Sequence, residues 1–301
     1  MINDIPQYEK FSKIEPIQKG WSSDKKYYIE TNDKEHFLLR ISDVSKYEEK
    51  KKEFDIMKKL EKVGIKMSNP ISFGVCNSGK NVYQILTWIE GNEAKEVLPL
   101  YSLKEQYLFG YKAGQMMLKM EIAENYPPSS NWQEIYSKKV FEYLKAYKIC
   151  GHRLYGEEIL LSFLEEHSAA IENRPMSLLH ADFQTDNMII SPNNELFAID
   201  FQGSGIVDPY YALTAVMVSA ENSPSFANGQ LHSYFNGDVP DEFWEISAFY
   251  MVAESINAFS VAVGLGQKEI DYSNEMSKTL LEWVDNFNNL VPSWYQKYTT
   301  E

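Results

Sequence analysis

The residues best suited to chemistry lie in one short part of this chain. His180, Asp182 and Asn187 form the pattern H-x-D-x-x-x-x-N, and Asp200 follows the asparagine by 13 positions. In phosphoryl transfer, an aspartate can orient an attacking hydroxyl and accept its proton, while an asparagine and a second aspartate hold Mg²⁺ on the nucleotide phosphates. The pattern therefore predicts Asp182 as the catalytic residue and Asn187 and Asp200 as ligands of Mg²⁺, a cation that prefers carboxylate and amide oxygens.

Each of these residues has a simpler interpretation when it is considered alone. Aspartate and asparagine often serve turns and helix caps, and a loop histidine is often only a hydrogen-bond partner. The residue types, their order and their spacing together favour the functional interpretation. For His180 we expect a structural hydrogen bond rather than proton transfer, because Asp182 already occupies the position of the base.

The first 90 residues are predicted to form a β-rich segment. Strands are expected at 26–30, 35–42, 71–76 and 82–88, with turn residues inside each pair. Between the pairs, Tyr47, Phe54, Met57 and Leu60 recur on one face of an amphipathic helix over 45–63. Gly64 ends this helix.

Beyond residue 91 the pattern becomes helical. Helices are expected at 103–121, 132–149, 156–172, 210–221, 242–263 and 274–289. A hairpin of strands at 188–191 and 196–201 interrupts them, and it would bring Asn187 and Asp200 together. The chain is thus predicted to be an α+β protein with a small β-rich lobe over 1–87 and a large, mainly helical lobe over 88–301.

Composition and charge exclude several classes of protein. The chain has 301 residues, 44% of them hydrophobic, which is enough for a full core, and its net charge of −14 repels nucleic acid and anionic lipid. Cys76 and Cys150 suit neither a metal site nor a disulfide framework, so we expect a reducing, cytoplasmic setting. The N-terminus lacks the apolar core of a signal peptide. The apolar stretch 248–266 contains polar residues that favour a buried helix, so we expect neither nucleic acid nor a membrane as a partner.

The pattern around His180, Asp182, Asn187 and Asp200, with no A-P-E segment after it, resembles the aminoglycoside phosphotransferase and choline kinase family. The resemblance covers nearly the whole chain and implies a bilobal, protein-kinase-like fold. It implies a small-molecule O-kinase that uses Mg²⁺ and ATP or GTP as phosphoryl donor, with Asp182 catalytic and His180 supporting the catalytic loop. Direct in-line transfer to a bound hydroxyl is expected, without a phosphoenzyme.

The same resemblance assigns nucleotide-binding positions in the first lobe. Arg40 stands where the family has a phosphate-binding lysine; it keeps the charge and adds a bidentate fork. Glu53 is its expected partner. The phosphate-covering loop holds a single glycine, with Ser22 and Ser23 as hydrogen-bond donors, and backbone groups of Thr87, Trp88 and Ile89 are expected to bind the purine.

The acceptor is expected to be cationic. Residues 1–90 carry a net charge of +2 and residues 91–301 a net charge of −16, so the second lobe should attract a polyamine-bearing sugar. The resemblance then points to aminoglycosides. Candidate substrate residues are Glu221, Glu254, Asp271 and Glu275; Glu254 lies within an apolar helix, where an unpaired carboxylate is costly.

Alternatives remain open at this point. Choline, ethanolamine or macrolide acceptors belong to the same family range, and an aromatic cage would suit choline. A protein kinase is disfavoured by the missing A-P-E segment. A non-catalytic, nucleotide-binding pseudokinase would account for Arg40 and for the glycine-poor loop. Asp208, before a proline, is assigned to helix capping.

Overall fold

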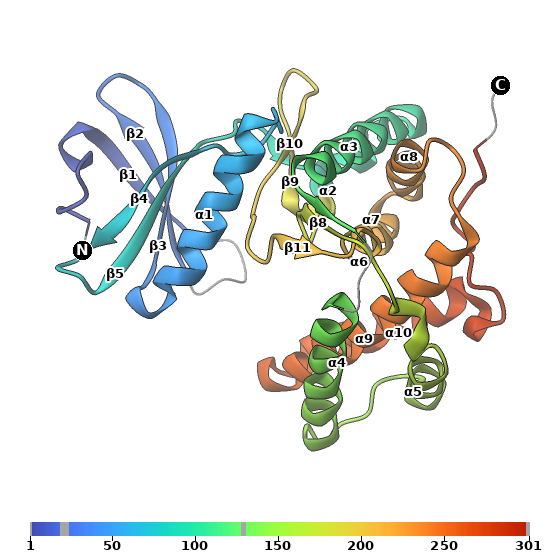
Figure 1. The fold of residues 1–301 in the computed structure, drawn as a ribbon. Helices are drawn as coiled ribbons and strands as arrows, with labels where there is room; N and C mark the ends of the chain where they lie inside the picture. Colours follow the sequence, from blue (N-terminus) through green and yellow to red (C-terminus); the bar gives the residue numbers. More distant parts are fainter. Residues whose placement is uncertain (1, 19–23, 128–130, 299–301) are drawn as a thin grey trace. The chain divides into compact units, whose positions relative to one another are not determined.

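The computed structural model describes residues 2–18, 24–127 and 131–298. The chain forms two compact units, each described here by itself (Figure 1): a first unit of Met1–Val97 with Thr185–Gly205, and a second unit of Leu98–Gln184 with Ile206–Glu301. The fold is mixed, with a β-sheet region and a mainly helical region, and the predicted α+β class is confirmed. The predicted division after Thr87 stays a prediction, because the compact units follow packing rather than chain order.

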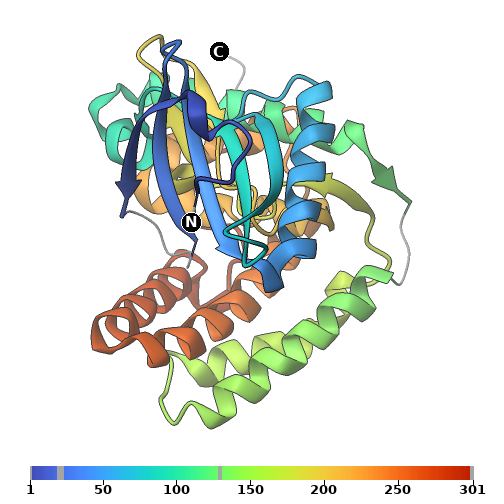
Figure 2. The same ribbon diagram turned by 90° about the vertical axis from the view of Figure 1, so that its left-hand side faces the viewer.

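The first unit is built on a five-stranded antiparallel sheet. Its strands and helix are β1 (Phe11–Ile17), β2 (Lys25–Thr31), β3 (His36–Asp43), β4 (Pro70–Cys76), β5 (Asn81–Thr87) and α1 (Tyr47–Lys62). The spatial order is β1-β2-β3-β5-β4, and α1 runs beside the sheet (Figure 2). The expected pairs of strands and the helix between them are confirmed. Short 3₁₀ turns at Tyr8–Lys10 and Val44–Lys46 precede β1 and α1.

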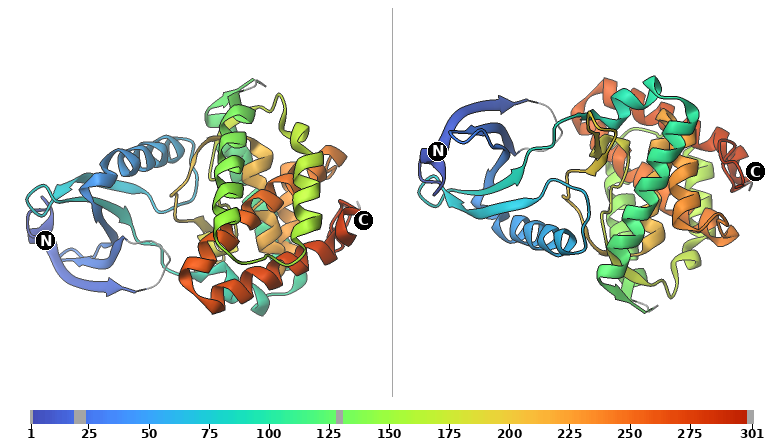
Figure 3. Two further views of the ribbon diagram at one scale, coloured as in Figure 1. Left: turned by 90° about the horizontal axis from the view of Figure 1, so that it is seen from below. Right: turned by 90° about the horizontal axis from the view of Figure 1, so that it is seen from above.

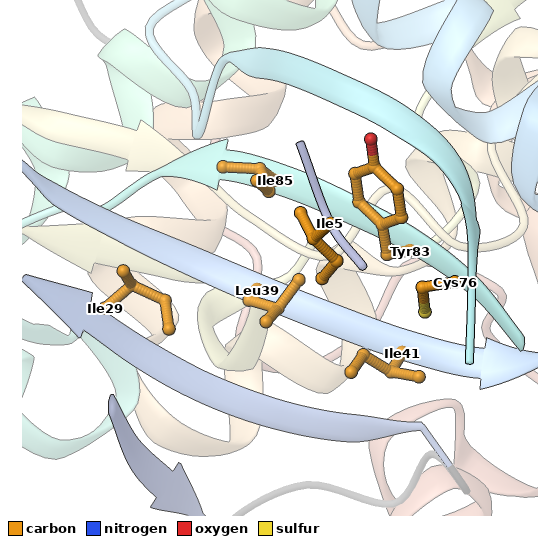
Figure 4. Packing of buried hydrophobic residues seen from close by; sticks show 7 residues of the cluster. All are labelled: Ile5, Ile29, Leu39, Ile41, Cys76, Tyr83 and Ile85. Atoms are coloured by element: carbon orange, nitrogen blue, oxygen red, sulfur yellow. The ribbon is translucent and has the colours of Figure 1, made fainter. Parts of the chain in front are cut away.

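Strand alternation sorts the side chains of this sheet. Leu39 and Ile41 of β3 face an apolar cluster, together with Ile85 of β5, and Ile5 from the N-terminal segment packs against them (Figure 4). Successive residues point to opposite faces. Arg40 therefore points to the other face, toward α1.

A hairpin from later in the sequence belongs to the first unit. Strands β9 (Met188–Ile190) and β10 (Leu196–Ala198) form a three-stranded sheet with β6 (Asn92–Glu93), which leads into α2 (Ala94–Val97). The hairpin was predicted, but its second strand ends at Ala198 rather than at 201. The chain leaves the strand there because Asp200 has a left-handed backbone, with φ 56°.

The second unit is mainly helical. Its helices are α3 (Leu103–Ala123), α4 (Asn131–Ile149), α5 (Glu157–Glu166), α6 (Pro209–Leu213), α7 (Val216–Asn222), α8 (Pro224–Tyr234), α9 (Asp241–Leu265) and α10 (Gln267–Trp283). Strands β7 (Asn125–Tyr126), β8 (Met176–Leu179) and β11 (Gly205–Val207) form a small sheet in the order β11-β8-β7. Further 3₁₀ turns lie at Leu98–Leu100, Ser168–Ile171, Thr185–Asn187 and Asp285–Phe287.

Helix α9 is apolar on all sides, as expected for a helix inside a core. It is long and apolar enough to cross a membrane by length and composition, but 56% of its most apolar window is buried within the described structure. It packs against α4 and α10. This agrees with the buried helix predicted at that position.

The structure differs from the predicted helices in four places. The helix expected at 156–172 ends at Glu166, as α5, and the 3₁₀ turn Ser168–Ile171 follows it. The helix expected at 210–221 is divided into α6 and α7. Thr214 ends α6: its backbone N–H bonds to the carbonyls of Tyr210 and Tyr211, and its hydroxyl bonds to the carbonyl of Tyr210. Helix α8 was missed, since its proline, asparagine and glycine disfavour a helix from sequence alone. Helix α10 begins and ends earlier than expected; Asp285, Asn286 and Phe287 have positive φ values, which stop it.

Glycines set the approach of α3 and α8, which lie side by side (Figure 3). A Cβ atom on Gly110 of α3 would lie 1.9 Å from the carbonyl oxygen of Phe226, and one on Gly229 of α8 would lie 2.1 Å from the carbonyl oxygen of Tyr107. The two backbones touch at these points. Any side chain there must push the helices apart.

We expect Gly110→Ala to destabilise the protein by about 2–4 kcal/mol, because the added methyl group meets backbone rather than a movable side chain. Urea unfolding followed by circular dichroism measures this. The matched control is Gly264→Ala in α9, where a Cβ atom meets nothing within 4 Å; its stability should stay unchanged or rise slightly. Equal stability of the two variants would contradict the packing argument.

Candidate active site

A buried arginine joins three separate parts of the first unit. The side chain of Arg40 is 3% exposed, and its Nη1 atom lies 3.1 Å from Glu53 Oε1 on α1 and 3.3 Å from Asp200 Oδ1 beyond β10. The expected pairing of Arg40 with Glu53 is confirmed. Asp200 joins the pair from 160 positions further along the chain.

Two residues that the sequence analysis did not select complete this group. Lys50 Nζ, on α1, lies 2.8 Å from Asp24 Oδ2 and 3.3 Å from Glu53 Oε2, and Arg40 Nη2 lies 3.0 Å from the same Asp24 oxygen. The hydroxyl of Ser42 donates to the other oxygen of Asp24. We call the following residues the Arg40 cluster: Asp24, Arg40, Lys50, Glu53 and Asp200.

Charge holds the Arg40 cluster together. Burial alone would raise the pKa of Asp24, but hydrogen bonds from Lys50 and Ser42 and the charge of Arg40 outweigh burial and bring this pKa to about 2. Burial also opposes the charge on Arg40, and the surrounding carboxylates, Glu53 first, outweigh it and raise the pKa of the guanidinium. Asp24 and Arg40 are therefore both ionised at neutral pH.

The predicted metal ligands are neighbours in the first unit. The backbone amide of Ile199 donates to the carbonyl of Asn187 at 2.9 Å, which ties the residue before Asp200 to Asn187. The left-handed backbone of Asp200 is uncommon for a residue with a side chain, and such strain often marks a functional position.

The donor set suits a hard divalent cation. The side chain of Asp200 is 33% exposed, and its Oδ2 atom has no hydrogen-bond partner in the described parts of the chain, while Oδ1 contacts Arg40. Within residues 2–18, 24–127 and 131–298, no three His, Cys, Asp or Glu residues form a metal site by themselves. A cation at Asn187 and Asp200 would thus complete its shell with phosphate oxygens and water, as Mg²⁺ commonly does.

The predicted purine-binding segment follows β5. The amide of Thr87 donates to Asn69 and the amide of Trp88 donates to His36, while the carbonyl of Thr87 accepts the hydroxyl of Ser68. The N–H and C=O of Ile89 form no hydrogen bond with any residue that the structure describes. Of the three predicted residues, Ile89 is therefore the one whose two backbone groups are available to a ligand.

The predicted catalytic residues lie in the second unit, in the loop after β8. His180 is fully buried, and its Nδ1 atom accepts the backbone N–H of Asp182 at 3.2 Å, which matches the structural hydrogen bond expected of it. The side chain of Asp182 is exposed, and its Oδ1 atom accepts a hydrogen bond from Gln184 Nε2 at 2.9 Å. His180 thus holds the backbone of Asp182, and Gln184 orients its exposed carboxylate.

Glu254, the carboxylate within the apolar helix α9, has partners. Its Oε1 atom accepts hydrogen bonds from the hydroxyls of Tyr136 and Tyr211, both at 3.1 Å, and of Tyr143 at 3.4 Å. Burial raises the pKa of Tyr211, the charge of Glu254 raises it further, and Asp182 also contributes. Tyr211 therefore keeps its proton at neutral pH and donates it in a hydrogen bond to Glu254.

The other predicted substrate residues do not join Glu254 in this way. Asp271 accepts a hydrogen bond from Gln267, and Glu275 lies 3.9 Å from Lys278, so both interact with their own helix α10. Glu221 is exposed on α7. The predicted phosphate-loop residues Ser22 and Ser23 lie outside the described residues.

Asp208 caps α6, as predicted, and does more. Its carboxylate accepts the N–H of Tyr210 at 2.9 Å, the Nε of Arg174 at 2.9 Å and the hydroxyl of Tyr250 at 2.6 Å. Trp132 donates to the same hydroxyl of Tyr250. This fully buried carboxylate links α6 to α9 directly and to α4 through Tyr250, whose ring packs against Tyr136 and Tyr211.

Several residues of these groups escaped the sequence analysis. Asp24 only precedes a strand, and Lys50 is one of three consecutive lysines, so spacing does not distinguish either of them. Tyr136, Tyr143 and Tyr211 come from distant helices. The sequence indicated only that Glu254, a carboxylate in an apolar helix, requires hydrogen-bond partners; it did not indicate which residues these are.

Comparisons with known proteins agree with this description. A model of the phosphotransferase enzyme family matches residues 13–244, well over half of the chain. No curated protein matches the chain significantly by sequence.

Solved structures share the fold at low sequence identity. An apo thermostable mutant of the aminoglycoside phosphotransferase APH(4)-Ia has a TM-score of 0.70 and 12% identity, over 92% of this chain and 96% of that one. The GDP complex of aminoglycoside 2′-phosphotransferase-IIIa has a TM-score of 0.67 and 15% identity, over 96% and 97%. A choline/ethanolamine kinase family protein from Mesorhizobium loti has a TM-score of 0.67 and 15% identity, over 96% and 95%.

The family that the motif around Asp182 resembles is thus confirmed by an independent comparison over most of the chain. The protein belongs to the phosphotransferase enzyme family and is a small-molecule phosphotransferase with a hydroxyl group as acceptor.

Proposed function

We propose that this protein transfers the γ-phosphoryl group of ATP or GTP to a hydroxyl of a cationic acceptor, an aminoglycoside. The observation that carries this proposal is the contact of Arg40 with both Glu53 and Asp200. Phosphoryl transfer needs a fixed cation for the phosphates and a carboxylate for the metal. In the first unit the guanidinium of Arg40 contacts both Glu53 of α1 and Asp200, the proposed metal ligand.

Asp182 acts on the acceptor hydroxyl in this proposal. Its carboxylate accepts the hydroxyl proton as the oxygen bonds to the γ-phosphorus, and the bond to the β-phosphate oxygen breaks to release the nucleoside diphosphate. The hydrogen bonds to His180 and Gln184 support this role, because they fix the loop and the carboxylate. Transfer is direct, so no phosphorylated residue is needed.

Asn187 and Asp200 are the proposed ligands of Mg²⁺, which neutralises charge on the phosphates when it is bound. Arg40 positions Asp200 for this task through its 3.3 Å contact. It also supplies the fixed positive charge for phosphates that are not transferred.

The nucleotide base is proposed to pair with the backbone of Ile89, whose N–H and C=O lack partners in the described chain. Adenine and guanine present a donor and an acceptor in opposite order on their base-pairing edge, so each base can pair with an N–H and a C=O of one residue in a different position. Similar structures hold either nucleotide: APH(4)-Ia with ADP and hygromycin B, and aminoglycoside 2′-phosphotransferase-IIIa with GDP. The donor is accordingly proposed as ATP or GTP.

The acceptor is proposed to bind near Glu254. Three tyrosine hydroxyls use one carboxylate oxygen, and Oε2 has no hydrogen-bond partner among the described residues, so it can receive an ammonium group. Acidic residues on the rest of the unit, Glu221, Asp271 and Glu275 among them, would add attraction for a polycation. Two cysteines without a disulfide fit a reducing cytoplasm, where such a kinase would meet its donor.

A single quaternary or primary amine, as in choline or ethanolamine, is the second candidate acceptor. The three tyrosines at Glu254 favour it, since aromatic rings beside a carboxylate attract a compact cation. The similarity to a choline/ethanolamine kinase family protein also supports it.

We expect Asp182→Asn to lower kcat by about 10²–10⁴-fold, because the amide cannot accept the hydroxyl proton. A coupled nucleotide-consumption assay with kanamycin, gentamicin, streptomycin, a macrolide and choline as acceptors measures this. Glu195→Gln, which removes an exposed charge from the turn between β9 and β10, is the control and should keep full activity. Full turnover by Asp182→Asn would disprove the proposed role.

We expect Glu254→Gln to raise KM for the cationic acceptor about tenfold with kcat little changed, because one charge-assisted contact is lost. Glutamine can still accept the tyrosine hydroxyls, so the fold should persist. Glu245→Gln removes a charge from the exposed side of the same helix and serves as the control. Identical KM values for both variants would rule out a substrate role for Glu254.

A further inference from the structure

Two cations are buried in the first unit, and their terminal nitrogen atoms contact carboxylates. Lys50 is 1% exposed and Arg40 is 3% exposed. Both Nη atoms of Arg40 already donate to carboxylates, and Lys50 Nζ contacts two carboxylates. The Nε atom of Arg40 is buried without a hydrogen-bond partner in the described chain. Because both side chains are almost fully buried, a phosphate can reach the Nη atoms of Arg40 and the Nζ atom of Lys50 only if a carboxylate leaves.

The charge balance points to the same conclusion. The Arg40 cluster holds two cations and three carboxylates, so an approaching phosphate meets an excess of negative charge. In a buried setting this excess acts more strongly than in water. Departure of one carboxylate would leave two cations and two anions, which a phosphate can approach.

Asp24 is the carboxylate best suited to leave. It lies immediately before β2, which begins at Lys25, so its backbone lies outside the β2–β3 strand pairing and can shift without breaking that pairing. Glu53 is held in the middle of α1, and Asp200 serves the metal in the proposed mechanism. Since the pKa of Asp24 is about 2, it leaves as an anion, which means that a competing anion rather than a proton must displace it.

We propose that Arg40 and Lys50 together form the site for the non-transferred phosphates of the nucleotide, and that Asp24 occupies this site as an internal counter-anion until the phosphates displace it. Lys50 thereby becomes a second phosphate-binding residue. The inference rests on the proposed function, because it assigns further residues to the same nucleotide site. One oxygen of Asp24 already bridges both cations, at 3.0 and 2.8 Å, as a phosphate oxygen would.

The proposal predicts opposite effects of Asp24→Asn on stability and on binding. The amide is a neutral isostere that can accept from the cations and donate to Ser42, so the apoprotein should fold but melt at a lower temperature. Affinity for ADP or GDP, whichever the wild type binds more tightly, should rise about tenfold. Affinity for the matching nucleoside, which has no phosphate, should not change. Differential scanning calorimetry measures the melting temperature, and calorimetric titration measures the affinities.

Two further variants separate the roles of the residues. Adding Lys50→Gln to Asp24→Asn should remove most of the tenfold gain, because the cation that Asp24→Asn released is then gone. The double variant removes one anion and one cation, so the net charge of the Arg40 cluster stays the same. Ser42→Ala loosens Asp24 without changing a charge and should give a smaller gain in the same direction. It keeps the test open if Asp24→Asn does not fold.

The control is Asp55→Asn, which removes a charge from the exposed side of α1, where Asp55 pairs with Lys51. It should leave nucleotide affinity unchanged. Unchanged or weaker diphosphate binding by both Asp24→Asn and Ser42→Ala would overturn the inference, as would a gain that survives Lys50→Gln. A folded wild type that binds neither ADP nor GDP would instead overturn the proposed function, and the inference with it.

Discussion

The first unit depends on the guanidinium of Arg40, a buried charge that three carboxylates hold in place. An ion removed from water is costly unless its partners surround it, so this arrangement is sensitive to the loss of any member. The carboxylates come from the residue before β2, from α1 and from the segment after β10. Their common partner ties a local helix and a distant hairpin to one strand. Apolar packing, which is not directional, would define the relative positions of these elements less precisely.

The arrangement follows from simple periodicities. On β3, the two-residue repeat places Leu39 and Ile41 in the apolar cluster and leaves Arg40 on the opposite face. On α1, Lys50 and Glu53 are three residues apart and therefore share one face of the helix. Gln84, directly opposite Arg40 in the sheet, donates to the backbone carbonyl of Lys50 and fixes the helix over the strand.

Much of this could be predicted from the sequence, and the misses have physical causes. The hairpins and the helix over 45–63 carry strong local periodicity, and the pattern from His180 to Asp200 identified the family. Local patterns could not select Asp24 or Lys50, since a buried pairing of distant charges leaves no spacing in the sequence. Helix α8 was missed for a related reason: its glycine, which weakens a helix in isolation, is required by a neighbouring backbone.

The contact between α3 and α8 limits which substitutions this protein can accept. The atoms nearest to Gly110 belong to the main chain of Phe226, which every residue type possesses. A larger residue at position 110 therefore cannot be compensated by trimming a side chain on the facing helix, as it often can elsewhere in a core. Suppressor substitutions would have to move a whole helix, so this crossing point should vary less freely than the apolar positions around it.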